Sequence, residues 1–499
     1  MSQYFPGSSN FTIEGGTFNT MTYSYRNAKG STTGGFERLQ EYVAHGAFHD
    51  SGERFDPPKC HDNTRVAIIK KIMDWISGLD EDTREALIMW LYGAAGAGKS
   101  AIAQTIAEIL DGQHFFLASF FFGRNDPQRG TAKLLVTTLA YQLAVKLPPM
   151  FRERLGLAFE KDPLINTRSL EAQFKALIRE PLLELLQFFS STKKHIVVII
   201  DGLDECEDTK VQARIIDLSF NLLRGRDIPL KILIVSRPEM DISASFDTKP
   251  FYTLARIALD DDYQSEEDIR HFLEDKLNEI NTQHRLRSYI PIGWPADDSL
   301  DTLVQKSSGQ FIYASTVVKY VASPRHRPMH RLDVVLGIQL PKAGDSPFAE
   351  LDALYRQILM GVEDVDLVLQ IIGFVVLHPP NFFNSVAFIE AFFSLAPGDV
   401  QLLMQDLSSL ISVENHPCYS DGSMSTVRLL HAFLKDYLLD QSRSKDFFLD
   451  RVKMHTQYAE LCLAHMTELP ALQSNSPRHP LTGMLPYVFI RLNFYILIA

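Results

Sequence analysis

The sequence holds only four cysteines among 499 residues, and no two of them form a C-x-x-C pair. Secreted domains that depend on disulfide bonds are rich in cysteine, and structural zinc sites use closely spaced cysteine pairs. The cysteine content therefore argues against both classes and favours reduced thiols in the cytosol. The four are Cys60, Cys206, Cys418 and Cys462.

The chain also has no excess of positive charge, since 49 Lys and Arg stand against 61 Asp and Glu, a net charge of −12. Binding to nucleic acid or to an anionic membrane needs the opposite balance. The first residues lack the basic and apolar regions of a secretory signal. The apolar run at 484–499 is interrupted by Arg491 and is shorter than the ~20 residues that span a bilayer. We therefore expect a cytoplasmic protein with no membrane span and no nucleic-acid partner.

What the sequence does contain is a glycine-rich loop, Gly-Ala-Ala-Gly-Ala-Gly-Lys-Ser at 93–100, which fits the pattern G-x-x-x-x-G-K-[ST]. Glycines let successive backbone N–H groups turn toward one anion. An apolar run at 87–92 precedes the loop and a helical pattern at 101–110 follows it, which is the strand–loop–helix context that the motif needs. Lys99 is expected to reach the β- and γ-phosphates and Ser100 to bind Mg²⁺. The predicted phosphate-binding residues are Gly93, Ala94, Ala95, Gly96, Ala97, Gly98, Lys99, Ser100 and Ala101.

Residues 86–245 alternate strand-like and helical segments, which is typical of a parallel sheet covered by helices on both faces. The strand-like runs are 87–92, 115–122, 196–200 and 230–235, and the helical ones between them are 131–147, 169–189 and 209–224. From about residue 264 the pattern is largely helical, up to two β-like runs at 410–413 and 426–430 joined by a turn with Asp421-Gly422. Helices followed by such a hairpin indicate a winged helix.

We therefore predict an α/β P-loop NTPase domain followed by a helical domain and a winged-helix domain. The predicted units are a low-charge tail (1–35), a helical lead-in (36–85), the NTPase domain (86–255), the helical domain (256–340), the winged-helix domain (345–450) and a helical, apolar end (451–499).

Acidic residues follow the strand-like run at 196–200. Asp201 comes at its end, where parallel sheets bind their ligands, so it is expected to hold Mg²⁺ opposite Ser100. Asp204 and Glu205 follow one turn later and are candidates to polarise an attacking water.

The run at 230–235 is followed by Ser236-Arg237-Pro238. An arginine at the end of a neighbouring strand can bond the γ-phosphate and report its presence. The predicted catalytic residues are therefore Asp204, Glu205 and Arg237.

Together these motifs resemble those of the NACHT family, nucleotide-binding switches of the STAND class, and above all its fungal members, whose P-loop domain is similar to the nephrocystin type. The resemblance covers roughly residues 36–465. It implies that Thr64 and Arg65 lie near the base or ribose, with a helix cap as the alternative role. It also implies that His431 meets the β-phosphate of ADP in the resting state, with an ordinary core histidine as the alternative. Segments 57–65, 308–314 and 429–434 also match, although Gln310-Phe311 stands where many relatives have a proline after the glycine.

By this resemblance the chain is expected to rest as an ADP-bound closed monomer and to self-associate when it binds ATP. Slow hydrolysis would reset it, and the role implied is fungal self/non-self recognition or programmed cell death, through trigger and effector proteins that the sequence does not name. Relatives commonly continue into ankyrin, WD40 or tetratricopeptide repeats, and whether this chain is truncated at residue 499 relative to a repeat-bearing form stays open. The lack of an [NT]-K-x-D sequence favours ATP, with GTP as the alternative.

Three alternatives stay open. The first is an ordinary P-loop ATPase or kinase that turns over continuously, although Asp204 and Glu205 favour water activation over transfer to a substrate. The second is a DNA-binding winged helix, which the two basic and seven acidic residues in 381–440 disfavour. The third concerns the low-charge segment 10–21, which is compatible with cross-β stacking or with a disordered or hairpin-forming tail.

Overall fold

The structure is a computed structural model. It describes residues 32–54, 57–113, 115–124, 126–192, 195–223, 228–259, 265–339, 346–378, 384–408, 410–417 and 423–475. Three sequence features lie outside the described residues: the low-charge segment at 10–21, the Asp421-Gly422 turn and the apolar run at 484–499.

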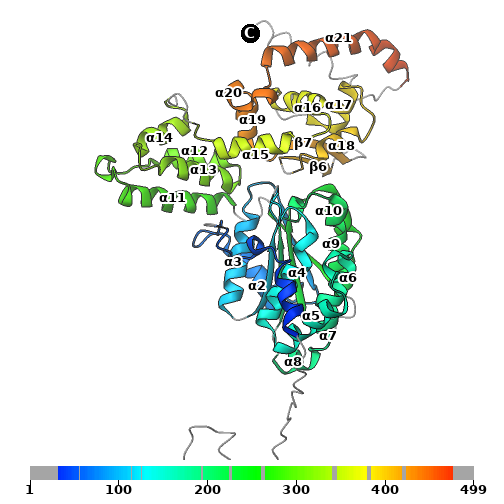
Figure 1. The fold of residues 1–499 in the computed structure, drawn as a ribbon. Coiled ribbons are helices and arrows are strands. Elements are labelled where there is room, and N and C mark those ends of the chain that lie inside the picture. Colours follow the sequence, from blue (N-terminus) through cyan, green and yellow to red (C-terminus); the bar gives the residue numbers. More distant parts are fainter. Residues whose placement is uncertain are drawn as a thin grey trace, which may run out of the picture.

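A parallel five-stranded sheet forms the centre of the first half, in the order β2-β3-β4-β1-β5 (Figure 1). The four predicted strands are confirmed, each to within one residue at either end. The fifth, β5, is not among the predicted strands, because it is an edge strand whose apolar run is broken by the exposed Arg256. It extends past the predicted boundary at residue 255. The strands are β1 (Ile88–Gly93), β2 (Phe116–Phe121), β3 (Ile196–Asp201), β4 (Leu230–Ser236) and β5 (Leu254–Leu259).

Alternate residues of the central strands face two separate hydrophobic cores. On β3, Ile196, Val198 and Ile200 belong to one core, and Val197 and Ile199 to the other. Burial on both faces explains why these strands are continuous apolar runs. The prediction of helices on both faces is therefore confirmed. The first core is covered by α1 (Thr32–Gln40), α4 (Leu135–Lys146), α5 (Pro149–Lys161), α6 (Leu170–Phe174), the π-helical turn η4 (Lys175–Arg179), α7 (Glu180–Leu183), α8 (Leu186–Thr192), α9 (Thr209–Leu222) and α10 (Met240–Asp247), and the second by α2 (Val66–Ser77) and α3 (Lys99–Gly112).

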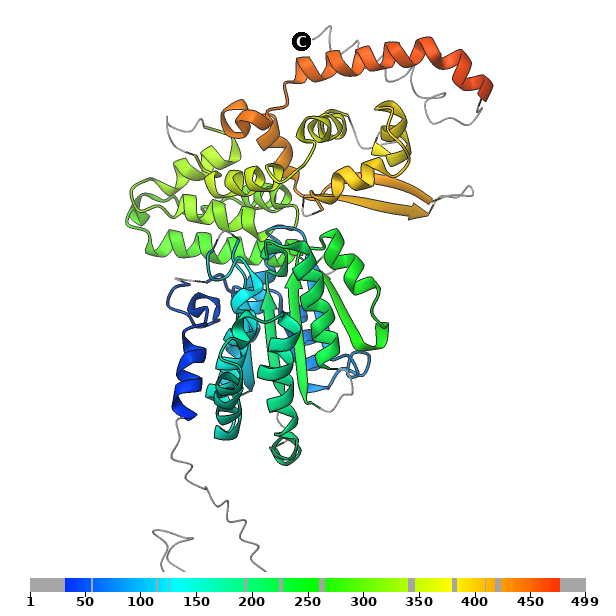
Figure 2. The same ribbon diagram turned by 45° about the vertical axis from the view of Figure 1, so that its right-hand side comes forward.

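The rest of the described chain is mostly helical and lies beyond one end of the sheet domain in both views (Figures 1 and 2). Four helices come first, α11 (Ser265–Gln283), α12 (Asp297–Ser307), α13 (Phe311–Val321) and α14 (Pro328–Leu336). The C-terminal unit then comprises α15 (Ala349–Leu359), α16 (Val365–Leu377), α17 (Val386–Phe392), α18 (Asp399–Gln405), β6 (Ile411–Pro417), β7 (Ser423–Leu429), α19 (Ala432–Leu438), α20 (Gln441–Ser444) and α21 (Arg451–Asn475).

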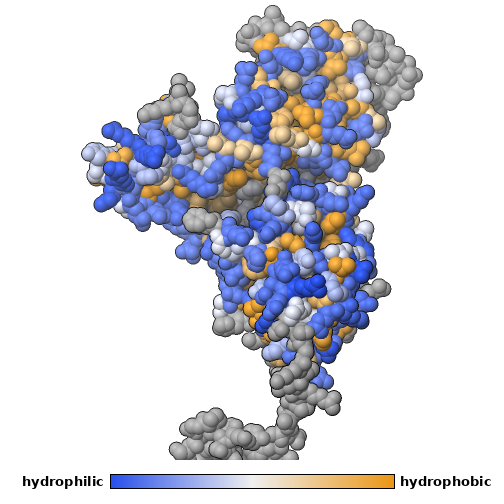
Figure 3. Space-filling model, in the orientation of Figure 1, coloured by the Kyte–Doolittle hydropathy of each residue, from blue (hydrophilic) through white to orange (hydrophobic). Residues whose placement is uncertain are grey.

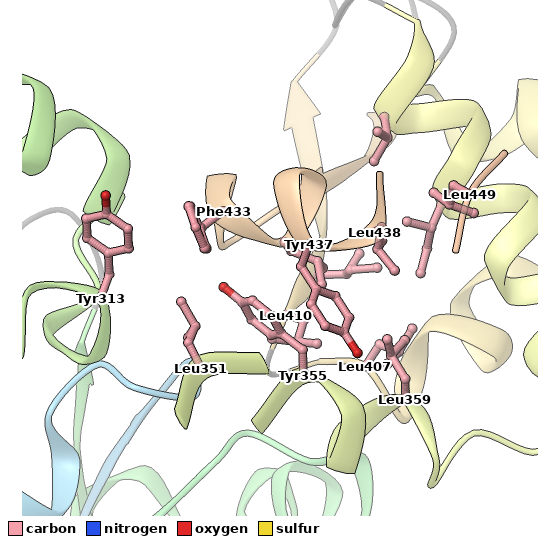
Figure 4. Close-up of a cluster of buried hydrophobic side chains, with 14 of the residues drawn as sticks. Tyr313, Leu351, Tyr355, Leu359, Leu407, Leu410, Phe433, Tyr437, Leu438 and Leu449 are labelled. Carbon is pink, nitrogen blue, oxygen red and sulfur yellow. The ribbon is translucent and has the colours of Figure 1, made fainter. Parts of the chain in front are cut away.

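Strands β6 and β7 pair antiparallel, with Ile411 opposite Leu429, so the predicted hairpin is present and longer than the two predicted β-like runs. A single hydrophobic core joins α11–α14 to the C-terminal unit. Figure 4 shows its middle, where α19 carries Phe433 and Tyr437 between α13 and α15. The ring of Phe433 lies 5.1 Å from that of Tyr313 on α13, and the ring of Tyr437 lies 5.3 Å from that of Tyr355 on α15. The two predicted domains on either side of residue 340 therefore share packing.

Hydrophobic side chains gather on the surface of the C-terminal unit, whereas the visible face of the sheet domain is mostly hydrophilic (Figure 3). Within the described part of the chain, no helix combines the length and the apolar character needed to cross a bilayer.

Candidate functional site

The candidate site lies where β1, β3 and β4 end. These strands are adjacent in the sheet, so the loops that follow Gly93, Asp201 and Ser236 meet at one edge. A cavity of about 390 Å³ opens there. The predicted site residues that line it are Thr64, Arg65, Ala95, Gly96, Gly98, Lys99, Ser100, Ala101, Asp201, Asp204, Glu205 and Arg237. The other predicted ones, Gly93, Ala94, Ala97 and His431, are not among its lining residues.

The glycine-rich loop is shaped for close approach by an anion. Gly96 and Gly98 have φ values of +75° and +91°, a region that residues with a Cβ rarely adopt. Lys99 begins α3, and its ammonium group donates to the carbonyls of Gly93 (2.9 Å) and Ala94 (2.7 Å). Burial lowers the pKa of Lys99 to about 8. The loop thus holds a buried cation next to backbone that can turn toward phosphate oxygens.

Asp201 and Ser100 face each other across the cavity floor. Their side chains are hydrogen-bonded, while burial raises the pKa of Asp201 to about 7. Oδ1 of Asp201 is buried and has no hydrogen-bond partner among the described residues. A carboxylate and a hydroxyl fit a hard cation such as Mg²⁺. The described residues include no group of three or more His, Cys, Asp or Glu that could hold a metal, so an ion here would need phosphate oxygens as further ligands.

The turn after β3 pairs with the end of β4. The buried Asp204 carboxylate accepts a hydrogen bond from the Arg237 backbone N–H (2.9 Å) and lies 3.2 Å from Arg237 Nε. Glu205 accepts from the Arg124 backbone N–H (3.1 Å), and burial raises the pKa of Glu205. The three predicted catalytic residues therefore lie together, with Arg237 held by Asp204 through its backbone N–H and its Nε.

Arg65 lines the same cavity from the stretch before α2. Its backbone N–H donates to Asp268 (3.0 Å) and its Nη2 to the Ala97 carbonyl (3.1 Å), while Nε and Nη1 have no hydrogen-bond partner among the described residues. Its guanidinium lies 5.0 Å from the ring centre of Phe311. An aromatic face and spare buried donors suit a base or ribose.

Thr64, next to Arg65, is buried, and its hydroxyl donates to the His61 carbonyl at 2.7 Å. The residue that precedes α2 is Arg65, and its side chain makes no capping bond. Arg65 thus occupies the N-cap position of α2 without a capping bond from its side chain, and the helix cap stays the alternative role of this pair.

His431 precedes α19 and is only 2% exposed. Its Nδ1 lies 3.2 Å from the hydroxyl of Tyr355. Burial lowers the pKa of His431 to about 4. A hydrogen bond with the Ala95 backbone acts to raise this pKa, and the charges of Lys99 and Arg237 act to lower it further. His431 is thus a buried neutral histidine, and the groups that act on it belong to the glycine-rich loop and the end of β4.

Several residues of the site have no predicted role. Arg124 and Glu239 pair at 4.0 Å beside the acidic turn, and burial raises the pKa of Glu239 to about 7. Arg124 comes shortly after the end of β2, the strand next to β3 in the sheet, so its position after a strand-like run is a signal that the sequence contains. Ile312 donates its N–H to the Gly96 carbonyl at 3.2 Å, a contact between α13 and the loop that no local pattern announces.

A comparison with known protein families finds a match to the sheet domain. The model of the nephrocystin 3 N-terminal family matches residues 69–237, which include the glycine-rich loop, the acidic turn and Arg237. No protein of curated function matches the sequence.

Among solved structures, the chain is similar to the Aeropyrum pernix ORC2 protein, with 12% identity over 85% of this chain and all of that one and a TM-score of 0.38. It is also similar to Cdc6p of Pyrobaculum aerophilum (11% identity, 77% and 96% covered, TM-score 0.33) and to a chain of Drosophila ORC bound to DNA (12%, 78% and 97%, 0.32). Such low TM-scores mean that the whole chains superpose poorly. The loop, the sheet order and the nephrocystin match together identify the sheet domain as an α/β P-loop NTPase domain.

Proposed function

We propose that this chain is a nucleotide-dependent switch of the NACHT class, which binds ATP or ADP with Mg²⁺ and hydrolyses ATP slowly. In the closed form the C-terminal unit, which we propose to be a winged helix, packs against the nucleotide site. ATP favours an open form that self-associates. The proposed biological role of the switch is in fungal self/non-self recognition or programmed cell death.

The observation that carries the proposal is the position of His431. This side chain comes from the far end of the chain, yet the Ala95 backbone and the Lys99 and Arg237 charges all act on it. Phe433, two residues on, packs against Tyr313 of α13 with ring centres 5.1 Å apart. A conformational change of the phosphate loop would therefore alter the surroundings of His431 and, through it, the packing of α19. A switch requires such a connection.

We assign a role in nucleotide binding or hydrolysis to the residues that line the cavity. Lys99 and the loop amides would bind the phosphates, and Arg65 and Phe311 the base or ribose. Ser100 and Asp201 are the residues that would hold Mg²⁺, which when bound neutralises phosphate charge. Glu205 is placed to polarise a water, and Arg237 to exchange Asp204 for a γ-phosphate oxygen.

A ligand shifts such an equilibrium only by its different affinity for the two forms. Going from 1% to 99% open takes about 5.5 kcal/mol of preference. We propose that Arg237, freed from Asp204 by the γ-phosphate, and His431, held at the loop when only ADP is present, supply opposite parts of that preference.

The test is to identify the nucleotide that co-purifies with the protein and then to exchange it for a non-hydrolysable ATP analogue. We expect bound ADP in the purified monomer and a larger particle in gel filtration after exchange. A folded protein that is loaded with the analogue and elutes at the same volume would contradict the switch.

A continuously cycling ATPase or a kinase is the second candidate, because the same phosphate loop and Asp201 would serve either. Asp204 and Glu205 favour water activation over transfer to a substrate, and so favour the ATPase of the two. Steady-state turnover separates these enzymes from the switch. A kcat within the ~1–100 s⁻¹ that is typical of kinases would favour the enzyme, and a value far below it the switch.

A further inference from the structure

The three residues proposed for hydrolysis are tied together by Arg124. Its backbone N–H donates to Glu205 Oε2 (3.1 Å), and its guanidinium donates through Nη2 to the carbonyl of Asp204 (3.1 Å). The carboxylate of that same Asp204 holds Arg237. The backbone of Arg124 thus holds the Glu205 side chain, and its guanidinium holds the main chain of the acidic turn at Asp204.

The loop that carries Arg124 is attached to the acidic turn on both sides. Before it, Phe122 extends the ladder by donating its N–H to the Asp201 carbonyl at 2.9 Å. After it, the Gly130 carbonyl accepts the N–H of Glu207 at 2.9 Å. Arg124 is therefore placed by the backbone and is not a freely rotating surface side chain.

Glu239, at the residue before α10, supplies a third anchor. Its Oε1 lies 4.0 Å from Arg124 Nη2, and both side chains are about one-third exposed. The pair joins the loop after β2 to the segment after β4, across the strand that carries Asp201. Because a planar guanidinium can bond a carbonyl and a carboxylate at once, arginine suits this place better than lysine.

We propose that Arg124 is a positioning residue for ATP hydrolysis, which acts by holding the acidic turn so that Glu205 faces the cavity and Asp204 stays beside Arg237. This inference rests on the proposed function. Arg124 is not among the described residues that line the cavity. It therefore acts on the rate of hydrolysis and leaves nucleotide binding unchanged.

The test compares Arg124→Gln with Arg129→Gln in the full chain. Arg129 belongs to the same loop, but its side chain bonds Asp126, at 3.0 Å through Nε, where that of Arg124 bonds the acidic turn. We expect Arg124→Gln to lower the single-turnover rate of ATP hydrolysis about tenfold, since small misplacements of catalytic groups have effects of this size. The Kd for ADP should stay within twofold of wild type, and Arg129→Gln should match wild type in both measurements.

Two further variants separate positioning from general damage. Arg124→Lys should recover part of the rate, because an ammonium group can still bond the Asp204 carbonyl. Glu239→Gln, which leaves Arg124 in place, should lower the rate by a smaller factor, and it also serves if Arg124→Gln fails to fold. A rate for Arg124→Gln within twofold of wild type, or above it, would overturn the inference while leaving the switch intact. A wild-type protein that neither binds nor hydrolyses nucleotide would overturn the proposed function first.

Discussion

The two ends of the cavity are built differently. The phosphate end comes entirely from loops that follow adjacent strands of one sheet, and its residues are close in sequence to recognisable motifs. The closing end is assembled from three distant segments, namely the stretch before α2 with Arg65, the start of α13 with Ile312, and the stretch before α19 with His431, which lies beside the cavity without lining it. The phosphate end is thus fixed by the sheet, whereas Ile312 and His431 take part in the closing end only while the helices that follow the sheet domain are packed against it.

This difference separates binding from switching. A residue at the phosphate end should determine whether nucleotide binds at all. A residue at the closing end should determine how long the nucleotide stays and which form of the protein it favours. Substitutions at the two ends are therefore expected to have effects of different size and of different kind.

The largest effect is expected at Lys99. Lys99→Ala removes the buried cation of the loop, and we expect the affinity for ADP to fall by on the order of 100-fold, as for loss of strong charge-assisted bonds. Fluorescent ADP titration measures this directly. Lys70→Ala, on the exposed face of α2, is the control and should bind as wild type does. Near-normal ADP affinity in folded Lys99→Ala would contradict the role of Lys99 in binding the phosphates.

Asp201→Asn should weaken binding in a way that depends on the metal. We expect about a tenfold loss of ATP affinity in Mg²⁺, since a charged ligand to the ion is removed, and no loss in EDTA. Asp217→Asn, at the Lys249 ion pair on α9, is the matched control. An equal loss with and without Mg²⁺ would mean that Asp201 supports the loop and not the ion.

The sequence predicts the phosphate end well because each of its residues is fixed by a local feature. A glycine pattern places Lys99 and Ser100, and the end of an apolar strand places Asp201 and Arg237. The closing end depends on how helices pack, which no short window contains. For His431 the family resemblance supplied the role, but the Tyr355 contact and the Ile312 bond to Gly96 come only from the structure.

Loss of His431 should change the lifetime of bound ADP more than the ability to bind it. His431→Ala removes the contact with Tyr355 next to the loop, worth roughly 1 kcal/mol, so we expect ADP to dissociate about fivefold faster in a stopped-flow chase. His378→Ala removes another buried histidine, the residue that follows α16, and should lower stability without changing the ADP rate. Equal dissociation rates in both variants would make His431 an ordinary core residue.

The smallest effect is expected from the titration of Glu239, at the edge of the phosphate end. Its pKa is 4.5 in its usual environment and is raised to about 7 by burial and by Asp204. Between these values the folded protein keeps a proton that the unfolded chain has released, so unfolding becomes more favourable as the pH rises. The melting temperature of the nucleotide-free protein should therefore fall from pH 5 to pH 7.5, in part through this group. Glu239→Gln removes its contribution and should make that fall shallower by about one degree, roughly the effect of 1 kcal/mol on a chain of 499 residues. An unchanged slope would mean that Glu239 is ionised in the folded protein at neutral pH, as a tighter pair with Arg124 would require.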